Sequence, residues 1–124
     1  MKLIIDGNVP SQKNGKVISI NRKTGARFIR SNDRVKSWQE QAILELTRQF
    51  DGYVTTKYPI SVTIIFYFDN LRRHDLDNAA AGCMDALVKS KIIEDDNVKF
   101  VDCLTLQYGG LDKVRPRAEI FIDD

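Results

Sequence analysis

The sequence predicts a single α+β domain over residues 1–124, in which a mixed or antiparallel sheet carries two packed helices. Three observations predict this class. A chain of 124 residues fits one domain. Apolar residues recur every three or four positions in two segments, as in helices, and at every second position in another, as in a strand. The predicted elements follow the order strand, strand, strand, helix, strand, helix, strand, strand, with no internal repeat.

The first 30 residues predict three short strands. Residues 1–7 form the first, and residues 9–15 read as a loop because of their Pro, Ser, Asn and Gly content. Residues 17–20 and 26–29 flank the basic, glycine-containing segment 21–25. Two apolar runs around such a turn predict a β-hairpin.

A helix and a strand follow the hairpin. Ser31, Asn32 or Asp33 can cap the start of the helix by accepting its free N–H groups. Apolar residues then recur at helical spacing: Val35, Trp38, Ala42, Leu46 and Phe50. Residues 60–69 form a half-buried strand, whose inward side chains are Val62, Ile64, Phe66 and Phe68.

The C-terminal part predicts a second helix and two strands. The helix runs from Asp77 to Ser90 and buries Leu76, Ala80, Cys83, Met84 and Leu87. Residues 98–108 and 114–122 are the strands. The segment 109–113 contains two glycines and predicts a hairpin between them.

Positive charge is concentrated near the N-terminus. Residues 1–50 hold 10 Lys and Arg against 4 Asp and Glu, whereas residues 51–124 hold 9 against 13. A polyanion that contacts the basic segment would explain this asymmetry.

No apolar run approaches the length of a membrane span, and the N-terminus lacks the apolar core of a signal peptide. We therefore expect a cytoplasmic protein with no membrane partner. Cys83 and Cys103 lie in apolar segments without Cys-x-x-Cys spacing. We expect both to be reduced and mostly buried.

Two acidic clusters carry the strongest functional signal: His74-Asp75-Leu76-Asp77-Asn78 and Glu94-Asp95-Asp96-Asn97. Asp75 and Asp77 stand two positions apart where an extended segment enters a helix, so both carboxylates can face one side. If the loop before residue 98 turns back toward the sheet, Asp95 or Asp96 joins them. Three converging carboxylates repel one another unless a cation lies between them, and Mg²⁺ prefers such oxygen ligands. The alternative is a helix cap at Asp77 or Asn78 and a solvated acidic loop.

The run Asp75-Leu76-Asp77-Asn78, followed by Asp85-Ala86-Leu87 and by Asp95-Asp96 before a strand, resembles the core of the RusA-type Holliday junction resolvases. These are small endodeoxyribonucleases, often carried by prophages. Pro10-Ser11-Gln12-Lys13-Asn14 and the hairpin that enters the Trp38 helix are also similar to that family.

The resemblance implies a homodimer that acts in DNA recombination and repair. It would cut four-way junctions and other branched DNA by paired symmetric nicks. The implied cofactor is Mg²⁺, with Mn²⁺ as a substitute and no small-molecule cofactor. The implied catalytic and metal-binding carboxylates are Asp75, Asp77 and Asp96, with Asp95 as a lesser metal ligand.

One position departs from the family pattern. The family commonly has a lysine four residues after the second aspartate, and this chain has Ala81 there. A lysine at that point can bind the scissile phosphate or stabilise transition-state charge. Lys89 lies more than about 10 Å further along the helix axis and is no simple substitute. A junction-binding protein without catalysis is therefore a second hypothesis.

Basic and polar residues in three places are the expected DNA contacts: Lys13 and Asn14 in the loop, Arg22, Lys23, Arg27 and Arg30 in the hairpin, and Arg72 and Arg73 beside the first acidic cluster. Such contacts position the DNA backbone without reading its sequence. The alternative for the hairpin is an ordinary solvated surface.

A third hypothesis is an Asp-x-Asp enzyme that acts on nucleotides or nucleotide-sugars. The chain has no glycine-rich loop of the Walker type. A small substrate also does not explain so broad a basic segment.

Overall fold

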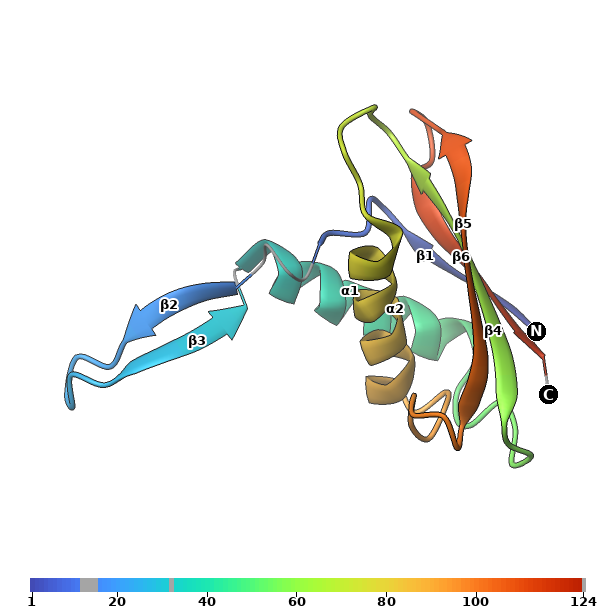
Figure 1. The fold of residues 1–124 in the computed structure, drawn as a ribbon, viewed down its shortest axis with the longest axis horizontal. Helices are drawn as coiled ribbons and strands as arrows, with labels where there is room; N and C mark the ends of the chain where they lie inside the picture. Colours follow the sequence, from blue (N-terminus) through green and yellow to red (C-terminus); the bar gives the residue numbers. More distant parts are fainter. Residues whose placement is uncertain (12–15, 32, 124) are drawn as a thin grey trace.

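The computed structural model of the chain describes residues 1–11, 16–31 and 33–123. Its elements, in chain order, are β1 (Lys2–Asp6), β2 (Lys16–Ile20), β3 (Arg27–Ser31), α1 (Asp33–Gln49), β4 (Ile60–Phe68), α2 (Leu76–Lys89), β5 (Val101–Leu111) and β6 (Arg117–Asp123). Figure 1 shows their arrangement. The predicted order of strands and helices is confirmed.

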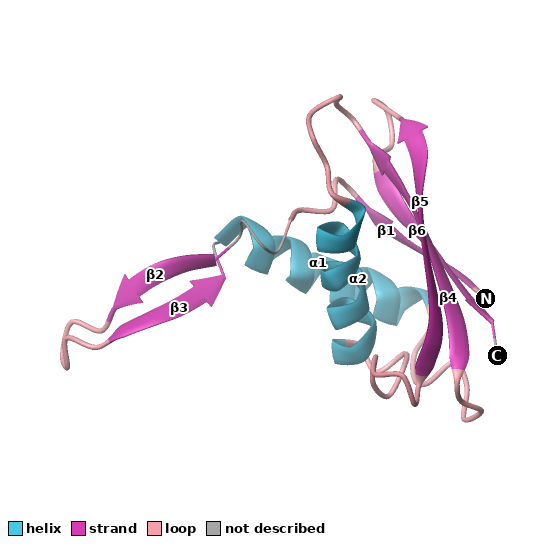
Figure 2. Ribbon diagram, in the orientation of Figure 1, coloured by secondary structure: helices cyan, strands magenta, loops and turns pink. Residues whose placement is uncertain are grey.

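Four strands form the main sheet, in the spatial order β1-β6-β4-β5. β5 runs parallel to β4, whereas β6 is antiparallel to both β4 and β1. Both helices lie on one face of this sheet (Figure 2). The predicted class, a mixed sheet with two packed helices, is confirmed. No helix in the described ranges is long and apolar enough to cross a membrane.

The core lies between the sheet and the helices. Every second residue of β4 points into it and is at most 1% exposed: Ile60, Val62, Ile64, Phe66 and Phe68. α1 contributes Val35, Ala42 and Leu46, and α2 contributes chiefly Ala80, Cys83, Met84 and Leu87. Trp38 and Leu76 are only partly buried. β4 therefore holds the centre of the fold, and its C-terminal end carries the loop that leads to Asp75.

The hairpin predicted between residues 98–108 and 114–122 is wrong. β5 and β6 are not neighbours, because β4 lies between them. The glycines that predicted a turn lie inside β5. A Cβ at Gly109 would come within 2.5 Å of the Tyr67 ring, so glycine lets this ring lie across the strand. Gly110 has a positive φ of 127° and follows a shift in register. Both glycines serve the pairing with β4.

The two cysteines differ in their surroundings. Cys83 is buried and free, as predicted, and burial raises the pKa of its thiol far above the ordinary value. Cys103 is free but exposed, so its predicted burial is wrong. It is paired in register with Ser61, on the sheet face opposite the helices. The apolar residues around Cys103 did not indicate its exposure, because β5 is an edge strand and this face of it is not covered by a helix.

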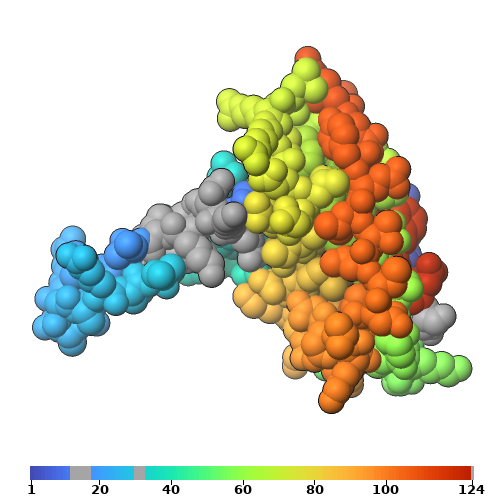
Figure 3. All heavy atoms as spheres, in the orientation of Figure 1, coloured from blue at the N-terminus to red at the C-terminus, as the bar shows by residue number. Residues whose placement is uncertain are grey.

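β2 and β3 pair with each other in a separate two-stranded sheet, which we call the arm. The predicted hairpin is confirmed. The arm projects from the body (Figures 1 and 3). Ile18 and Ile29 lie directly opposite each other on it and are 71% and 70% exposed. The arm therefore carries its side chains well beyond the core, where a large partner can contact them.

Candidate metal site and nucleic-acid interface

The first acidic cluster lies where β4 leads into α2. Asp75 immediately precedes the helix in an extended conformation, and its side chain makes no capping hydrogen bond. Its carboxylate has two long contacts, 3.4 Å to Arg73 Nε and 3.5 Å to Asn78 Nδ2. A helix cap at Asp77 or Asn78, the structural alternative, is wrong because Asp75 occupies the cap position. The acidic side chains are thus not explained by helix capping.

Asp77 and Asp96 line one groove of about 310 Å³ between α2 and β5. Asp77 lies in the first turn of α2, and Asp96 lies in the loop between α2 and β5. The remaining lining is apolar: Ala80, Ala81, Met84, Val101, Leu104 and Leu106. The loop after α2 turns back to the sheet, as the sequence required for the two acidic clusters to meet.

The environment of Asp96 disfavours its negative charge. Partial burial raises the pKa of this carboxyl, and the neighbouring Asp95 and Asp85 raise it further. Asp95 is held within its own loop. One of its oxygens accepts the Asp96 N–H at 2.7 Å, and the other accepts the Asn97 side-chain N–H at 3.1 Å. A cation beside Asp96 would relieve this repulsion.

Asp85 is an acidic neighbour that the sequence analysis did not identify as a site residue. It lies two helical turns after Asp77, with Ala81 between them. Its spacing could have indicated this, because Asp77, Ala81 and Asp85 stand four apart, and residues four apart share one face of a helix. The interaction with Asp96 became visible only when the loop after α2 was placed.

Asp75 is not brought into the groove. It lines a separate cleft, described below. Within the described ranges, no three His, Cys, Asp or Glu side chains are arranged to hold a metal ion. Two of the three predicted ligands, Asp77 and Asp96, line the same groove. Mg²⁺ often takes only one or two protein carboxylates and completes its shell with water and phosphate. Asp77 and Asp96 have the donor chemistry that such an ion takes.

Asp96→Asn is expected to raise the melting temperature of the metal-free protein at pH 7. The folded pKa lies above the ordinary value of 3.8, so stability is lost as pH rises from that value through the raised one. The advantage of the variant should therefore disappear below about pH 4. Thermal melts in EDTA at both pH values measure this, and added Mg²⁺ should stabilise only the parent. A variant no more stable than the parent at pH 7 would contradict the electrostatic account.

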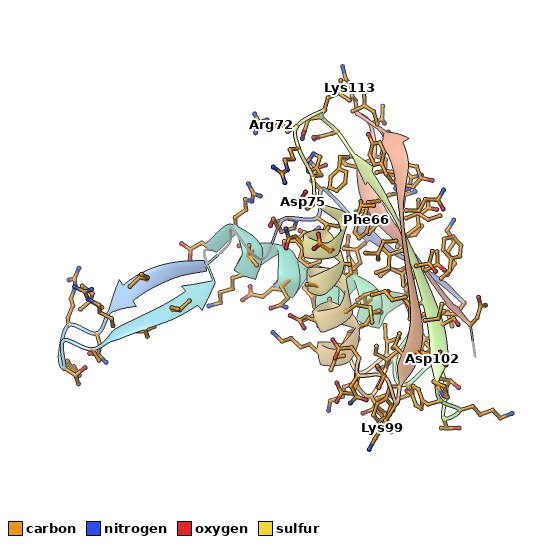
Figure 4. All side chains as sticks on the ribbon, in the orientation of Figure 1. Phe66, Arg72, Asp75, Lys99, Asp102 and Lys113 are labelled. Atoms are coloured by element: carbon orange, nitrogen blue, oxygen red, sulfur yellow. The ribbon has the colours of Figure 1, made fainter. Side chains whose placement is uncertain are left out.

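A larger cleft of about 930 Å³ lies at the other side of the α2 N-terminus. We call it the arginine cleft because Arg34, Arg72 and Arg73 line it together with Asp75. Figure 4 shows Arg72 and Asp75 at this end of the molecule, far from Lys99 and Asp102. Arg72 and Arg73 are exposed. Their position beside an acidic cluster is compatible with the predicted DNA contacts.

His74 is part of the wall of this cleft. Its ring stacks on Phe68 with centroids 3.8 Å apart and planes at 4°. Its Nε2 lies 2.9 Å from Asn70 Oδ1, which also accepts the Arg72 N–H. Burial lowers the pKa of this imidazole, although the Asp69 charge opposes the shift. We infer that His74 is neutral near pH 7 and holds the loop in place.

The predicted DNA contacts on the arm are only partly described. Arg22, Lys23 and Arg27 are exposed at its tip. Asn21 Oδ1 accepts the Lys23 and Thr24 N–H groups at 2.9 and 3.3 Å and so shapes the turn. Lys13 and Asn14 lie outside the described residues, as does the side chain of Arg30. The arm thus places three basic side chains far from the groove.

Comparison with known proteins gives two findings. The family model described as Endodeoxyribonuclease RusA matches residues 7–123. A protein of Aquifex aeolicus (strain VF5), named crossover junction endodeoxyribonuclease RusA, is 39% identical over 67 residues. That match covers 54% of this chain and 52% of the relative, so the aligned part spans about half the length of each protein.

Proposed function

The chain belongs to the RusA family of endodeoxyribonucleases, and on this premise we propose that it cuts four-way junctions and other branched DNA by metal-assisted phosphodiester hydrolysis. The observation that carries the proposal is the groove that Asp77 and Asp96 line together. Two carboxylates from separate segments line an otherwise apolar groove, and the pKa of one of them, Asp96, is raised by partial burial and by Asp95 and Asp85. That arrangement suits a divalent cation better than it suits a purely structural role.

We assign Asp77 and Asp96 as ligands of Mg²⁺, for which Mn²⁺ could substitute. A bound divalent cation supplies activation of water and neutralises charge on the phosphate in such reactions. Asp95 positions the Asp96 backbone through the 2.7 Å hydrogen bond. Asp75 remains a proposed third ligand. The ion pair between Asp75 and Arg73 is long and exposed, and such pairs contribute little stability. Asp75 can therefore give up this contact to bind a cation.

DNA would be held by phosphate contacts on both sides of the carboxylates. Arg72 and Arg73 border the arginine cleft, and Arg22, Lys23 and Arg27 extend along the arm. Arginine suits phosphate geometry because its guanidinium donates two parallel hydrogen bonds. Paired nicks in a twofold-symmetric junction need two active sites, and the described part of the chain has one Asp77–Asp96 groove. A C2 dimer would supply both.

The direct test is a cleavage assay on a synthetic four-way junction and on its matching linear duplex, each with Mg²⁺ and with EDTA. We expect paired nicks in the junction, none in the duplex, and none in EDTA. An intact junction under every metal condition would contradict the proposal. Hydrolysis of free nucleotides without action on DNA would instead favour the Asp-x-Asp nucleotide enzyme.

A second function, junction binding without catalysis, is favoured by one observation. Ala81 lines the groove between Asp77 and Asp96, where the family commonly places a lysine. Lys89 does not replace it, because its Nζ donates to Gln39 Oε1 of α1 at 3.0 Å. This function predicts a shifted band with the junction and no nicks in either Mg²⁺ or Mn²⁺.

Ala81→Lys is expected to increase the single-turnover rate of junction cleavage about tenfold or more, because an ammonium beside the scissile phosphate stabilises developing charge. Ala81→Met is the matched control, since it adds similar length without charge. Equal rates in the two variants would show that charge at this position does not assist the reaction.

A further inference from the structure

The arginine cleft is larger than phosphate contacts alone require. Its described lining comes from the segment after β1, the first turns of α1, the end of β4, the loop before α2 and the first turn of α2. Its volume of about 930 Å³ lies at the upper end of the range for small-molecule sites. The proposed cleavage chemistry uses only Asp75 of this lining.

The charged part of the lining favours an anion. The lining holds three guanidinium groups, those of Arg34, Arg72 and Arg73, and one carboxylate, that of Asp75. The neighbouring amides are already engaged. Asn70 Nδ2 donates to Asp69 Oδ1 at 2.8 Å, and Asn78 Nδ2 donates to Asp75 Oδ2 at 3.5 Å. The guanidinium groups are therefore the main donors left for a ligand.

The rest of the lining is aromatic and apolar. Trp38 and Phe68 lie in the wall with Val9, Pro10 and Val35. Two polar atoms of this wall, Trp38 Nε1 and Ser11 Oγ, are buried and have no hydrogen-bond partner within the described part of the chain. A buried donor without a partner destabilises the fold, because it has lost its hydrogen bonds to water. Trp38 Nε1 can only donate, so its partner must be an acceptor.

We propose that the arginine cleft binds one unstacked nucleotide of the DNA strand next to the cleavage site, with its phosphate on the arginines and its base against Trp38. This inference rests on the proposed function. A nucleotide has three features that complement the lining of the cleft: an anion, a flat aromatic face and hydrogen-bond acceptors. Bases without pairing partners stack readily on aromatic side chains.

The same geometry would make the protein selective for branched DNA. A base inside a duplex must first be unpaired and unstacked, which costs free energy, before it can enter a protein pocket. For a nucleotide at a branch point, this free energy of unpairing and unstacking is smaller. The cleft therefore binds branched DNA more tightly than duplex DNA. Because it lies beside Asp75 and the start of α2, this preference places branched DNA next to the candidate site.

Trp38 provides the test because it is the only tryptophan in the chain. Its fluorescence in EDTA would be followed during titration with a single-stranded dT tetranucleotide, with inorganic phosphate and with a linear duplex. We expect a saturable change with the tetranucleotide and little change with the other two. An equal change in fluorescence with inorganic phosphate would show that the cleft binds an anion without a base, and would overturn the proposal.

Arg72→Ala and Arg73→Ala should each weaken the tetranucleotide response about tenfold. The control is Lys57→Ala, which removes the same charge from an exposed lysine before the start of β4, at the opposite end of that strand. Equal affinities in all three variants would contradict the assigned phosphate contacts.

Trp38→Phe keeps an aromatic ring and removes the N–H. Binding of a tetranucleotide that carries 2-aminopurine should weaken severalfold in this variant, without a change in melting temperature. Unchanged binding would contradict the role of the indole N–H.

Cleavage of the four-way junction is measured in parallel. If the junction is bound and cut while Trp38 fluorescence stays constant, the cleft proposal fails and the nuclease proposal stands. If the tetranucleotide changes the fluorescence and no junction is cut, the cleft proposal is supported and the nuclease proposal fails.

Discussion

Asp77→Asn is expected to reduce cleavage of a four-way junction by about 100- to 1000-fold while leaving junction affinity within about twofold. The substitution keeps the size of the side chain and removes the negative charge that a cation needs as a ligand. Asp77 is exposed in the first turn of α2, so the helix should remain folded. Loss of its favourable interaction with the helix dipole costs less than about 1 kcal/mol.

Single-turnover cleavage in Mg²⁺ and a gel-shift titration in EDTA measure the two effects separately. The matched control is Asp102→Asn, because Asp102 is also an exposed carboxylate, on β5 and outside the groove lining. The control should cut at the parent rate. Full cleavage by the Asp77 variant would remove this residue from the proposed metal site.

Phe66→Ala is expected to lower the free energy of unfolding by about 4 kcal/mol. Phe66 lies in the C-terminal half of β4, is fully buried, and its ring stacks near that of Phe68 with centroids 6.1 Å apart (Figure 4). Its removal leaves a cavity between the sheet and the helices that rigid neighbours cannot fill. Because Phe68 supports the His74 ring, the loss should also loosen the loop that holds Asp75.

Urea denaturation measures this loss. The control is Phe28→Ala, the same substitution on the arm, where the side chain is 47% exposed. Substitutions at such surface positions usually change stability by less than about 0.5 kcal/mol. Similar losses in the two variants would contradict the assignment of Phe66 to the core.

Local patterns predicted most of the secondary structure. The alternation in residues 60–68 and the helical spacing in α1 and α2 arise from which face of each element is buried, and this is written directly in the sequence. The arm was also predicted, because its turn and both its strands are contiguous in the chain. Such elements depend mainly on neighbours within a few residues.

The pairing of the strands was harder to predict from the sequence. Gly109 and Gly110 carry the composition of a turn, yet they lie inside β5, where they accommodate Tyr67 and a shift in register. The requirement comes from a residue more than 40 positions earlier in the chain. A sequence read locally cannot distinguish a glycine needed by a turn from one needed by a neighbouring strand.

Local patterns in the sequence were enough to predict the acidic residues of the candidate site and their place at the start of α2 and in the loop after it. Their grouping depends on the packed fold, which places Asp77 and Asp96 along one groove, Asp85 near Asp96, and Asp75 in the arginine cleft. The physical reason is that spacing along one helix or strand is fixed by backbone geometry. The meeting of separate segments depends on how a loop returns to the sheet, and the packing of the whole core sets that path.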